Sequence, residues 1–315
     1  MLLKVYYNSL ILKNLLKQKR FMIMNVIAKI RKTFYRIKHN CRRKNRNYYS
    51  INDIKILQDK IFSINESISL GTSTWENFRR EIRTKILEGY LSDFLNWNVI
   101  QQSMFHEANE IEYLEVMKNP LLSISVKESN VGNPKPYFLD NSTSGNLIHN
   151  AYSVVKLFNK LKDPQKELKR IIEFGGGYGS MCRLFRNMEF SGKYIIFDLP
   201  EFSALQKFYL NSINTKYIKN TIFAGKEDMN KYSNDSLGTL FIATWSFSEM
   251  PLELREEILN NLKFNYCIIA FQNQFDGIDN LKYFNNFIKK YKNINFDLSP
   301  IKHLEGNYYL IGTKK

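Results

Sequence analysis

The sequence has few cysteines and no long apolar run. Its three cysteines, Cys41, Cys182 and Cys267, form no C-x-x-C pair, which argues against a disulfide framework or a zinc ribbon and favours a reducing compartment. No stretch of about 18 apolar residues is present, so we expect no transmembrane helix. Charged residues interrupt the N-terminal apolar run, which disfavours a secretory signal. These absences predict a cytoplasmic protein.

Acidic residues are missing from the N-terminal segment. Residues 1–52 contain eight lysines, six arginines and no Asp or Glu, so nearly all of the net charge of +16 lies there and the rest of the chain is almost neutral. The apolar residues of this segment recur at helical spacing, at Val26, Ile27, Ile30, Phe34 and Ile37. We therefore interpret residues 1–50 as a basic amphipathic tail, with Met22 and Met24 as alternative start sites.

Two kinds of contact and a plain tail are the alternatives for this segment. A basic amphipathic helix suits an anionic membrane surface or a partner protein, which would place the chain at the inner face of the membrane. Nucleic acid is the other natural polyanion. It is the less favoured partner, because RNA recognition usually spreads positive charge around the active face and the remainder of the chain is nearly neutral.

The most informative stretch is residues 170–210, which predicts a strand, a glycine turn, a helix and a second strand. The first strand leads into Glu173, and glycines follow at 175, 176, 177 and 179. Glycines in such a turn let the backbone bend sharply and approach a ligand closely. Asp198 ends the second strand about 20 residues after Gly177, which is the offset of a ribose-binding acid. The stretch predicts a site for an adenosine cofactor.

The spacing of the glycines narrows the choice of cofactor. A dinucleotide fingerprint would need glycine at position 180, where Ser180 stands, and no P-loop lysine follows. S-adenosylmethionine (SAM) carries no phosphate, and Glu173 suits its positive charge. EFGGGYG and FDLPE resemble motif I and the post-I motif of class I SAM-dependent methyltransferases. VGNPKPYF, STSGNLIHNAYSVVKLF and SFSEM resemble segments of a bacterial family of sugar O-methyltransferases.

This resemblance implies a SAM-dependent O-methyltransferase. The acceptor it implies is a hydroxyl of a sugar, a nucleotide-sugar or a glycan precursor of a surface polysaccharide. Two other readings stay open: an RNA methyltransferase that uses the basic tail, and a catalytically inactive SAM-binding module. Several sugar methyltransferases use a divalent metal. Asp276 and Asp279 lie close together, but no spacing in the sequence requires a metal, so we predict no metal ligands and leave metal dependence open.

Strand and helix patterns alternate from residue 166 to the end, which predicts a parallel sheet with helices on both faces. The expected strands are 170–174, 193–197, 216–223, 238–243, 264–271, 293–298 and 307–313, and the expected helices are 178–188, 201–211, 251–262 and 278–291. The last two strands form a hairpin, as in the Rossmann-like, seven-stranded methyltransferase sheet that the resemblance implies. Residues 51–165 form a helical and loop-rich substrate or lid region, with a loop over 119–150 and a helix over 150–161. Residues 166–315 form the SAM-binding domain.

Ligands of open α/β sheets lie at the carboxyl ends of the strands, so these ends supply the candidate site residues. The candidates for cofactor binding are Glu173, Gly175, Gly176, Gly177, Tyr178, Gly179, Asp198, Leu199, Asp228, Met229 and Thr244. The candidates for substrate binding are Trp245, Ser246, Gln272 and Asn273. Amides beside aromatic residues suit the hydroxyls and apolar faces of a sugar.

The general base is harder to predict. Phenolic O-methyltransferases carry a histidine after the fourth strand, but Trp245 and Ser246 stand there. The candidates are Glu249, His303 and His149, because a sugar hydroxyl is hardly ionised at neutral pH. A helix-capping acid, a surface turn and a core or capping histidine are the alternative roles of these three. We expect a surface or capping role for His106.

Overall fold

The computed structural model describes residues 49–65, 72–232 and 237–315. The predictions for the basic tail therefore fall outside the described residues, except at Tyr49 and Ser50. The N-terminal part that is described is helical, as expected. It consists of α2 (Ile51–Phe62), α3 (Ser73–Glu88), the 3-10 helix η1 (Leu91–Asn96), α4 (Asn98–Ser103), α5 (Glu110–Lys118) and α6 (Pro120–Ser125). No helix in the described ranges is long and apolar enough to cross a membrane.

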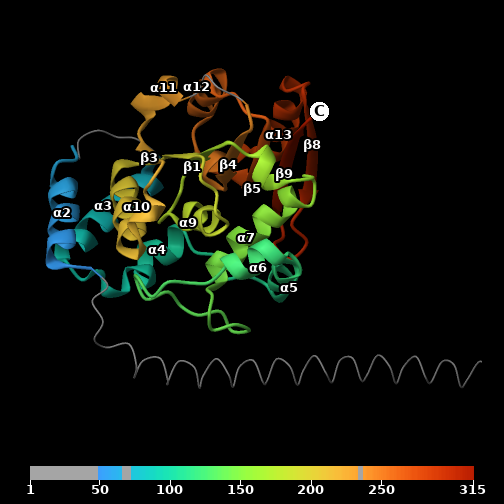
Figure 1. The fold of residues 1–315 in the computed structure, drawn as a ribbon. Helices are drawn as coiled ribbons and strands as arrows, with labels where there is room; N and C mark the ends of the chain where they lie inside the picture. The colour runs from blue at the N-terminus through green and yellow to red at the C-terminus, as the bar shows by residue number, and fades with distance from the viewer. Residues whose placement is uncertain (1–48, 66–71, 233–236) are drawn as a thin grey trace, which may run out of the picture.

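A seven-stranded sheet forms the centre of the molecule (Figure 1). Its strands are β1 (Arg170–Phe174), β2 (Lys193–Phe197), β3 (Thr221–Ala224), β4 (Thr239–Thr244), β5 (Tyr266–Gln272), β8 (Ile294–Pro300) and β9 (Asn307–Lys314). The order is β3-β2-β1-β4-β5-β9-β8; β1 to β5 are parallel, and β9 runs antiparallel to both of its neighbours. The predicted Rossmann-like α/β fold with an antiparallel last strand is confirmed.

Helices cover both faces of the sheet. One face carries α7 (Gly145–Phe158), α9 (Ser180–Asn187) and α10 (Pro200–Ile213), and the other carries α11 (Met229–Tyr232), α12 (Leu252–Asn261) and α13 (Asn280–Lys290). Neighbouring residues of β1 belong to different cores, Ile171 to the first and Ile172 to the second. A strand buried on both faces needs apolar residues at every position, which explains the continuous apolar run in the sequence.

The remaining elements are short and lie in the segments that connect the longer strands and helices. They are α8 (Pro164–Glu167), η2 (Thr215–Tyr217), η3 (Lys226–Asp228), η4 (Ser246–Glu249), β6 (Gln274–Phe275) and β7 (Ile278–Asp279). The sequence predicted a strand over 216–223, but η2 replaces its first half. The side chain of Asn214 accepts a hydrogen bond from Lys216 N, which favours a 3-10 turn there. A left-handed Asn220, with φ of 58°, then precedes the strand.

The helix predicted over 150–161 begins earlier, at Gly145. Ser144 is its N-cap, and the Ser144 side chain accepts a hydrogen bond from Leu147 N at 3.2 Å. His149 therefore lies in the second turn of α7 and not at the end of a loop. The segment 119–150 is less loop-rich than predicted, since Asn119 caps α6 through Leu121 N and Leu122 N.

The N-terminal helices pack on the α7–α9–α10 face and reach the edge where the parallel strands end. In Figure 1, α2 and α3 lie beside α10. A buried ion pair joins α3 to α10, with Arg79 Nε 2.8 Å from Glu201 Oε2. Helix α5 packs on α7, and α7 contacts β5 and β9. Side chains from these helices therefore stand next to the carboxyl ends of the parallel strands.

Candidate functional site

The turn after β1 has a shape that only glycine permits. Gly175 and Gly177 have φ values of +73° and +57°, which are unfavourable for residues with a side chain. A Cβ on Gly175 would overlap Ser246, and a Cβ on Gly176 would lie 2.6 Å from Ile196 Cγ2. The turn is therefore pressed against the ends of β2 and β4, and its backbone is open towards the carboxyl ends of the strands.

Tyr178 and Gly179 anchor this turn to the helices. The Tyr178 hydroxyl accepts a hydrogen bond from Asn146 Nδ2 at 3.1 Å, and its ring meets Tyr209 edge-on at 5.1 Å. Burial raises the pKa of Tyr178, so the phenol stays neutral. Gly179, with φ of +97°, is the N-cap of α9 and packs against Leu210. Gly179 lines neither cavity described below, so its part in the site is to shape the turn.

Asp198 stands at the end of β2, opposite the glycine turn. Its Oδ1 accepts from Leu199 N at 2.8 Å and its Oδ2 from Gln206 Nε2 at 2.6 Å. The same Gln206 amide lies 3.0 Å from Gly177 O, so it ties the carboxylate to the turn. Burial raises the pKa of Asp198 to about 7, although these hydrogen bonds oppose the shift. The carboxyl group is thus poised to ionise when a donor binds to it.

Glu173 is the last acid of β1 and is almost completely buried. It accepts a hydrogen bond from the Tyr194 hydroxyl at 2.8 Å. Burial raises its pKa to about 8; the hydrogen bond from Tyr194 opposes this shift and the charge of Asp198 adds to it. The carboxyl is therefore largely protonated at pH 7, and a cation placed beside it would favour its ionised form.

Two adjoining cavities lie at the carboxyl ends of the strands. The larger, of about 910 Å³, is lined by five of the predicted cofactor residues, Gly175, Asp198, Leu199, Asp228 and Met229. The smaller, of about 320 Å³, is lined by most of the others, Glu173, Gly176, Gly177, Tyr178 and Thr244, as well as by Gly175 and Asp198. Both cavities are bordered by Trp75, Gly175, Asp198, Ser246 and Glu249. The structure thus brings the predicted cofactor residues together around one site, with Gly179 just behind it.

The β4 end supplies an aromatic wall in a strained conformation. Trp245 has φ of +64°, an uncommon value for a bulky residue. Its backbone N–H donates to Ala270 O at 2.6 Å, and its indole Nε1 donates to Asn307 Oδ1 at 2.7 Å. Ser246 Oγ donates to Phe174 O and thereby ties the loop to β1. Strain of this kind persists where surrounding contacts hold a residue in place, often at functional sites.

The predicted residues Glu249, Gln272 and Asn273, at the ends of β4 and β5, differ in whether they line a cavity. Glu249 borders both cavities and accepts from Gln272 Nε2 at 3.2 Å. Burial raises the pKa of Glu249, and hydrogen bonds from Gln272 and Trp75 oppose the shift. Gln272 lines neither cavity, and Asn273 is exposed with its N–H bonded to Gly306 O. The expectation that the amides of Gln272 and Asn273 form the substrate wall therefore does not hold for these two cavities.

A cluster of histidines surrounds a buried glutamate at the smaller cavity. Glu112 of α5 accepts from His149 Nδ1 at 2.7 Å and from His303 Nε2 at 2.8 Å, both at Oε1. The His106 ring lies 4.0 Å from that of His149, and the Trp245 ring lies 5.1 Å from it. His106 and His149 line the cavity, whereas His303 lies behind Glu112. Three of the four histidines in the chain therefore meet here.

Glu112 was not among the residues predicted from the sequence, and His106 was expected to have a surface or capping role. A signal for Glu112 exists, because it shares the buried face of α5 with Val116, one helical turn later. The capping box with Asn109 pairs one oxygen of Glu112, and an acid on an apolar helix face needs partners for both. His106 is half-buried, and burial and the positive charge of His149 lower its pKa to about 4.

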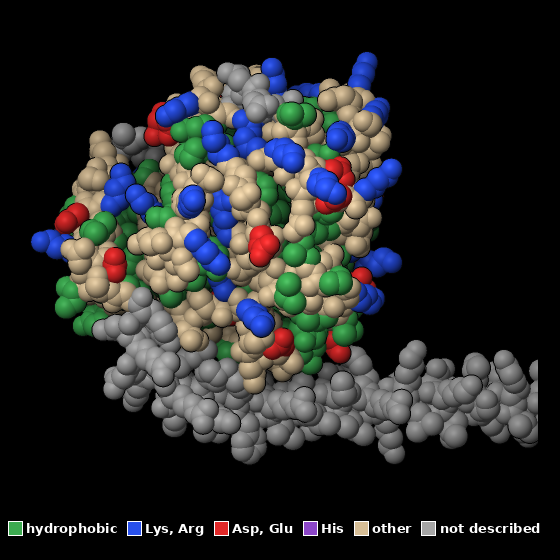
Figure 2. All heavy atoms as spheres, in the orientation of Figure 1, with side chains coloured by type: hydrophobic (Ala, Val, Ile, Leu, Met, Phe, Trp, Pro, Cys, Tyr) green, Lys and Arg blue, Asp and Glu red, His purple; other side chains and the backbone are tan. Residues whose placement is uncertain are grey.

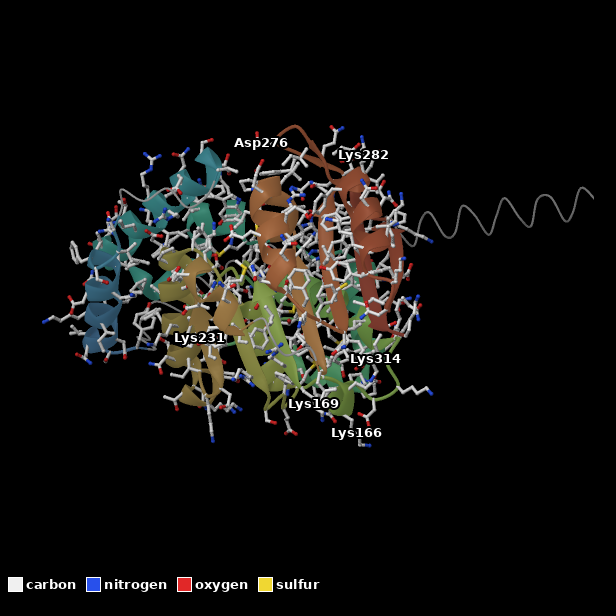
Figure 3. The ribbon with its side chains drawn as sticks, turned by 90° about the horizontal axis from the view of Figure 1, so that it is seen from above. Lys166, Lys169, Lys231, Asp276, Lys282 and Lys314 are labelled. Atoms are coloured by element: carbon white, nitrogen blue, oxygen red, sulfur yellow. The ribbon has the colours of Figure 1, made fainter. Side chains whose placement is uncertain are left out.

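The acids considered for a metal do not belong to this cluster. Asp276 is exposed on the β6–β7 turn at the rim of the molecule (Figure 3). Asp279 caps α13, accepting from Lys282 N at 2.9 Å. Within the described ranges, no group of three or more His, Cys, Asp or Glu side chains is placed to hold a metal ion. The labelled Lys169 and Lys314 lie at the opposite end of the sheet (Figure 3).

No protein-family model and no curated protein matches the chain. Solved structures do match it. A SAM-dependent methyltransferase from Aquifex aeolicus shares 15% identity over 48% of this chain and 88% of its own, with a TM-score of 0.35. A precorrin-6y C5,15-methyltransferase from Geobacter metallireducens shares 13% identity over 53% of this chain and 87% of its own, with a TM-score of 0.35. A glycopeptide N-methyltransferase shares 8% identity over 53% of this chain and 90% of its own, with a TM-score of 0.39. Such distant likenesses do not identify a substrate, so function has to be argued from this chain's own site.

Proposed function

We propose that the chain is a SAM-dependent methyltransferase. The observation that carries this proposal is the glycine-only turn after β1 facing Asp198 at the end of β2, with both bordering adjoining cavities. Ligands of open α/β sheets bind at this edge. The cavity volumes of about 910 and 320 Å³ are in the range of small-molecule sites, and together they leave room for a cofactor and an acceptor.

The residues present fit the groups of SAM. Asp198 accepts hydrogen bonds from ribose hydroxyls, and Leu199 and Met229 provide apolar contacts for the adenine in the larger cavity. Asp228, which lines the same cavity, accepts from the adenine amino group. Glu173 faces the smaller cavity and gains a cationic partner for a carboxyl group that burial now keeps protonated. When bound, SAM supplies a methyl group on a cationic sulfur, and its transfer to a hydroxyl oxygen leaves a neutral thioether and one proton to be taken up.

We also propose a sugar hydroxyl as the acceptor. The resemblance of 131–138, 142–158 and 246–250 to sugar O-methyltransferases supports it. The smaller cavity supports it too, because its wall combines amides and hydroxyls with aromatic rings, at Gln102, Ser103, Phe105, Asn146, Asn150 and Trp245. Apart from Trp245, which follows β4, this wall comes from the N-terminal region and α7. It takes the place that the sequence assigned to Gln272 and Asn273.

Calorimetry and methyl transfer test the proposal in two steps. Titration of SAM into the full chain should show one site, and Asp198→Asn should weaken binding at that site. Labelled methyl from SAM should then pass to a member of a panel of nucleotide-sugars and not to total RNA. Transfer to RNA would favour the RNA methyltransferase reading, and binding without any transfer would favour an inactive SAM-binding module. Absence of SAM binding would refute the proposed function altogether.

RNA as the acceptor has weaker support from the described surface. On the face shown in Figure 2, Lys and Arg side chains are dispersed among acidic, apolar and polar ones. The concentrated positive charge lies in residues 1–52.

We propose that residues 1–50 contact an anionic membrane surface. Co-sedimentation with vesicles containing phosphatidylglycerol should capture the full chain and not one that starts at Ser50; equal capture of both would contradict this proposal.

A further inference from the structure

The buried glutamate and its histidines point to a role in proton transfer. Glu112 is completely buried, yet both of its oxygens have donors: Oε1 has His149 and His303, and Oε2 has the backbone N–H of Asn109 at 3.1 Å. Burial alone would raise the pKa of Glu112, but the hydrogen bonds and charges of the two histidines outweigh it and the net pKa is lowered. Glu112 is therefore a carboxylate, which can only accept hydrogen bonds.

The charge state of Glu112 determines where His149 carries its proton. Because Glu112 Oε1 only accepts, His149 Nδ1 must be the donor across the 2.7 Å contact. A neutral His149 then has a bare Nε2 with a lone pair. This Nε2 is buried and has no hydrogen-bond partner among the described residues, even though His149 lines the smaller cavity. A buried polar atom without a partner costs roughly 1–3 kcal/mol, so a retained one indicates a ligand.

The other titratable groups that face His149 support the same protonation state. The His106 ring lies 4.0 Å from the His149 ring, and burial is the largest cause that lowers the pKa of His106, to about 4. A neutral His106 adds no positive charge beside His149 at pH 7. His303 lies on the far side of Glu112 and donates to the same oxygen. The indole ring of Trp245 lies 5.1 Å from the His149 ring and carries no charge.

We propose that His149 is the general base of this site, taking the acceptor hydroxyl proton at Nε2, and that Glu112 is the positioning residue that holds His149 in the Nδ1–H form. This inference rests on the proposed function. The oxygen lone pair forms the new bond to carbon, the carbon–sulfur bond electrons stay on sulfur, and the hydroxyl proton moves to Nε2. The imidazolium that results is stabilised by the Glu112 carboxylate and later loses its proton to water. His303, a predicted base, supports Glu112 instead.

A hydroxyl of ordinary acidity is the class of acceptor that this arrangement serves. A phenol or a carboxyl group ionises more readily and gains less from a base. A positioned base of near-neutral pKa contributes typically 10²–10⁴-fold to rate. Histidine on a carboxylate is suited to this task because the carboxylate fixes its tautomer and orientation, as in the catalytic triads of hydrolases.

The first test reads the tautomer and needs no substrate. Long-range ¹H–¹⁵N spectra of the full chain, labelled with ¹⁵N-histidine at pH 7.5, should show His149 protonated at Nδ1 and bare at Nε2; His149→Gln assigns the signal. Glu112→Gln should abolish this preference. Glu115→Gln, one turn away on α5 and in an exposed pair with Lys118, is the matched control and should leave it intact. A proton on Nε2, or on both nitrogens, would overturn the proposal.

The second test separates a base from a structural tie. His149→Gln keeps a donor for Glu112 but cannot take a proton, so it should retain SAM affinity within about twofold and lose roughly 10²–10⁴-fold in kcat. At saturating SAM, the acidic limb of the kcat/KM profile for the acceptor should disappear in this variant and persist in the exposed control Glu115→Gln. A kcat within threefold of the unmodified chain would refute the base while leaving the proposed function intact. Loss of SAM binding by the unmodified chain would instead refute the proposed function.

Discussion

Replacing Asp198 by Asn is the most direct test of the cofactor site, because it removes an ionisable group and almost no volume. Asp198 Oδ2 accepts from Gln206 and Oδ1 from Leu199 N, and asparagine can keep the second of these contacts. Two donors would then face one another where Gln206 meets the new amide, if that amide nitrogen takes the Oδ2 position. A hydrogen bond to a charged group contributes about 1.5–3 kcal/mol, so SAM affinity should fall roughly 10- to 100-fold at pH 8.

The pH dependence of binding gives a sharper expectation. The pKa of Asp198 is raised to about 7 by burial, so the free protein holds a proton there at pH 6 and has lost it at pH 8. Ribose hydroxyls favour the ionised carboxylate. The ionised fraction rises about tenfold between pH 6 and pH 8, and SAM affinity should rise by the same factor. Below pH 7, binding should release a proton from this group.

Calorimetry in buffers of different ionisation enthalpy measures both the affinity and the protons released. Titrations at pH 6, 7 and 8 should show the tenfold rise in the unmodified chain and a flatter profile in Asp198→Asn. Asp297→Asn is the matched control, since Asp297 lies on β8 in an exposed pair with Lys160. If the two variants share the same pH profile, Asp198 is not the group that meets the ribose.

Three further changes have expected outcomes. Glu173→Gln should be as stable as the unmodified chain at pH 5 and more stable at pH 9, by an amount on the order of 4 kcal/mol. The reason is that the pKa of Glu173 is raised to about 8, so the stability of the unmodified chain falls as pH rises from about 4.5 to 8. Urea unfolding across this pH range measures the difference, and parallel stability profiles of the two proteins would contradict it. Gly175→Ala should destabilise the chain by about 2–4 kcal/mol and weaken SAM binding, because the φ of Gly175 is +73° and the new methyl group overlaps Ser246. An unchanged unfolding temperature together with an unchanged SAM affinity in calorimetry would refute this. Arg255→Met should lower the free energy of unfolding in urea by about 3 kcal/mol, because buried Arg255 donates to three acceptors, on η4, on the loop after it and on α13. Arg80→Met, on the exposed face of α3, is the control and should change stability little. Equal losses of stability in the two variants would contradict this expectation.

The cofactor half of the site could be predicted from the sequence because its residues lie close together in the chain. The glycine turn follows β1 directly, and Asp198 follows the next strand of the same unit. Strand burial on both faces produces apolar runs that are easy to recognise. Errors arose at element ends, where one side chain decides. Ser144 caps α7, which begins at Gly145, five residues before the predicted start at 150. Asn214 caps η2, which stands where the third strand was predicted to begin.

The acceptor half could not be predicted in the same way. His149 and Glu112 are 37 residues apart, and His303 and Glu112 are 191 apart. No local pattern connects them, because their contact depends on how α5 packs on α7 and on where the β8–β9 turn ends. The sequence suggested His149 and His303 as separate candidates. The structure shows that they contact the same carboxylate oxygen of Glu112, and our proposal makes His303 the supporting residue.

SAM binding and proton transfer should be separable by mutation, because the residues proposed for them come from different parts of the chain. The proposed cofactor residues Glu173 and Asp198 lie on β1 and directly after β2, whereas Glu112 and His149 belong to helices that precede the sheet in the chain. The two sets meet at the smaller cavity, whose lining includes Glu173, Asp198 and His149. Changes to α5 should therefore alter proton transfer and acceptor choice while SAM still binds. Changes to the glycine turn should remove both, because the acceptor hydroxyl has nothing to attack unless the cofactor is in place.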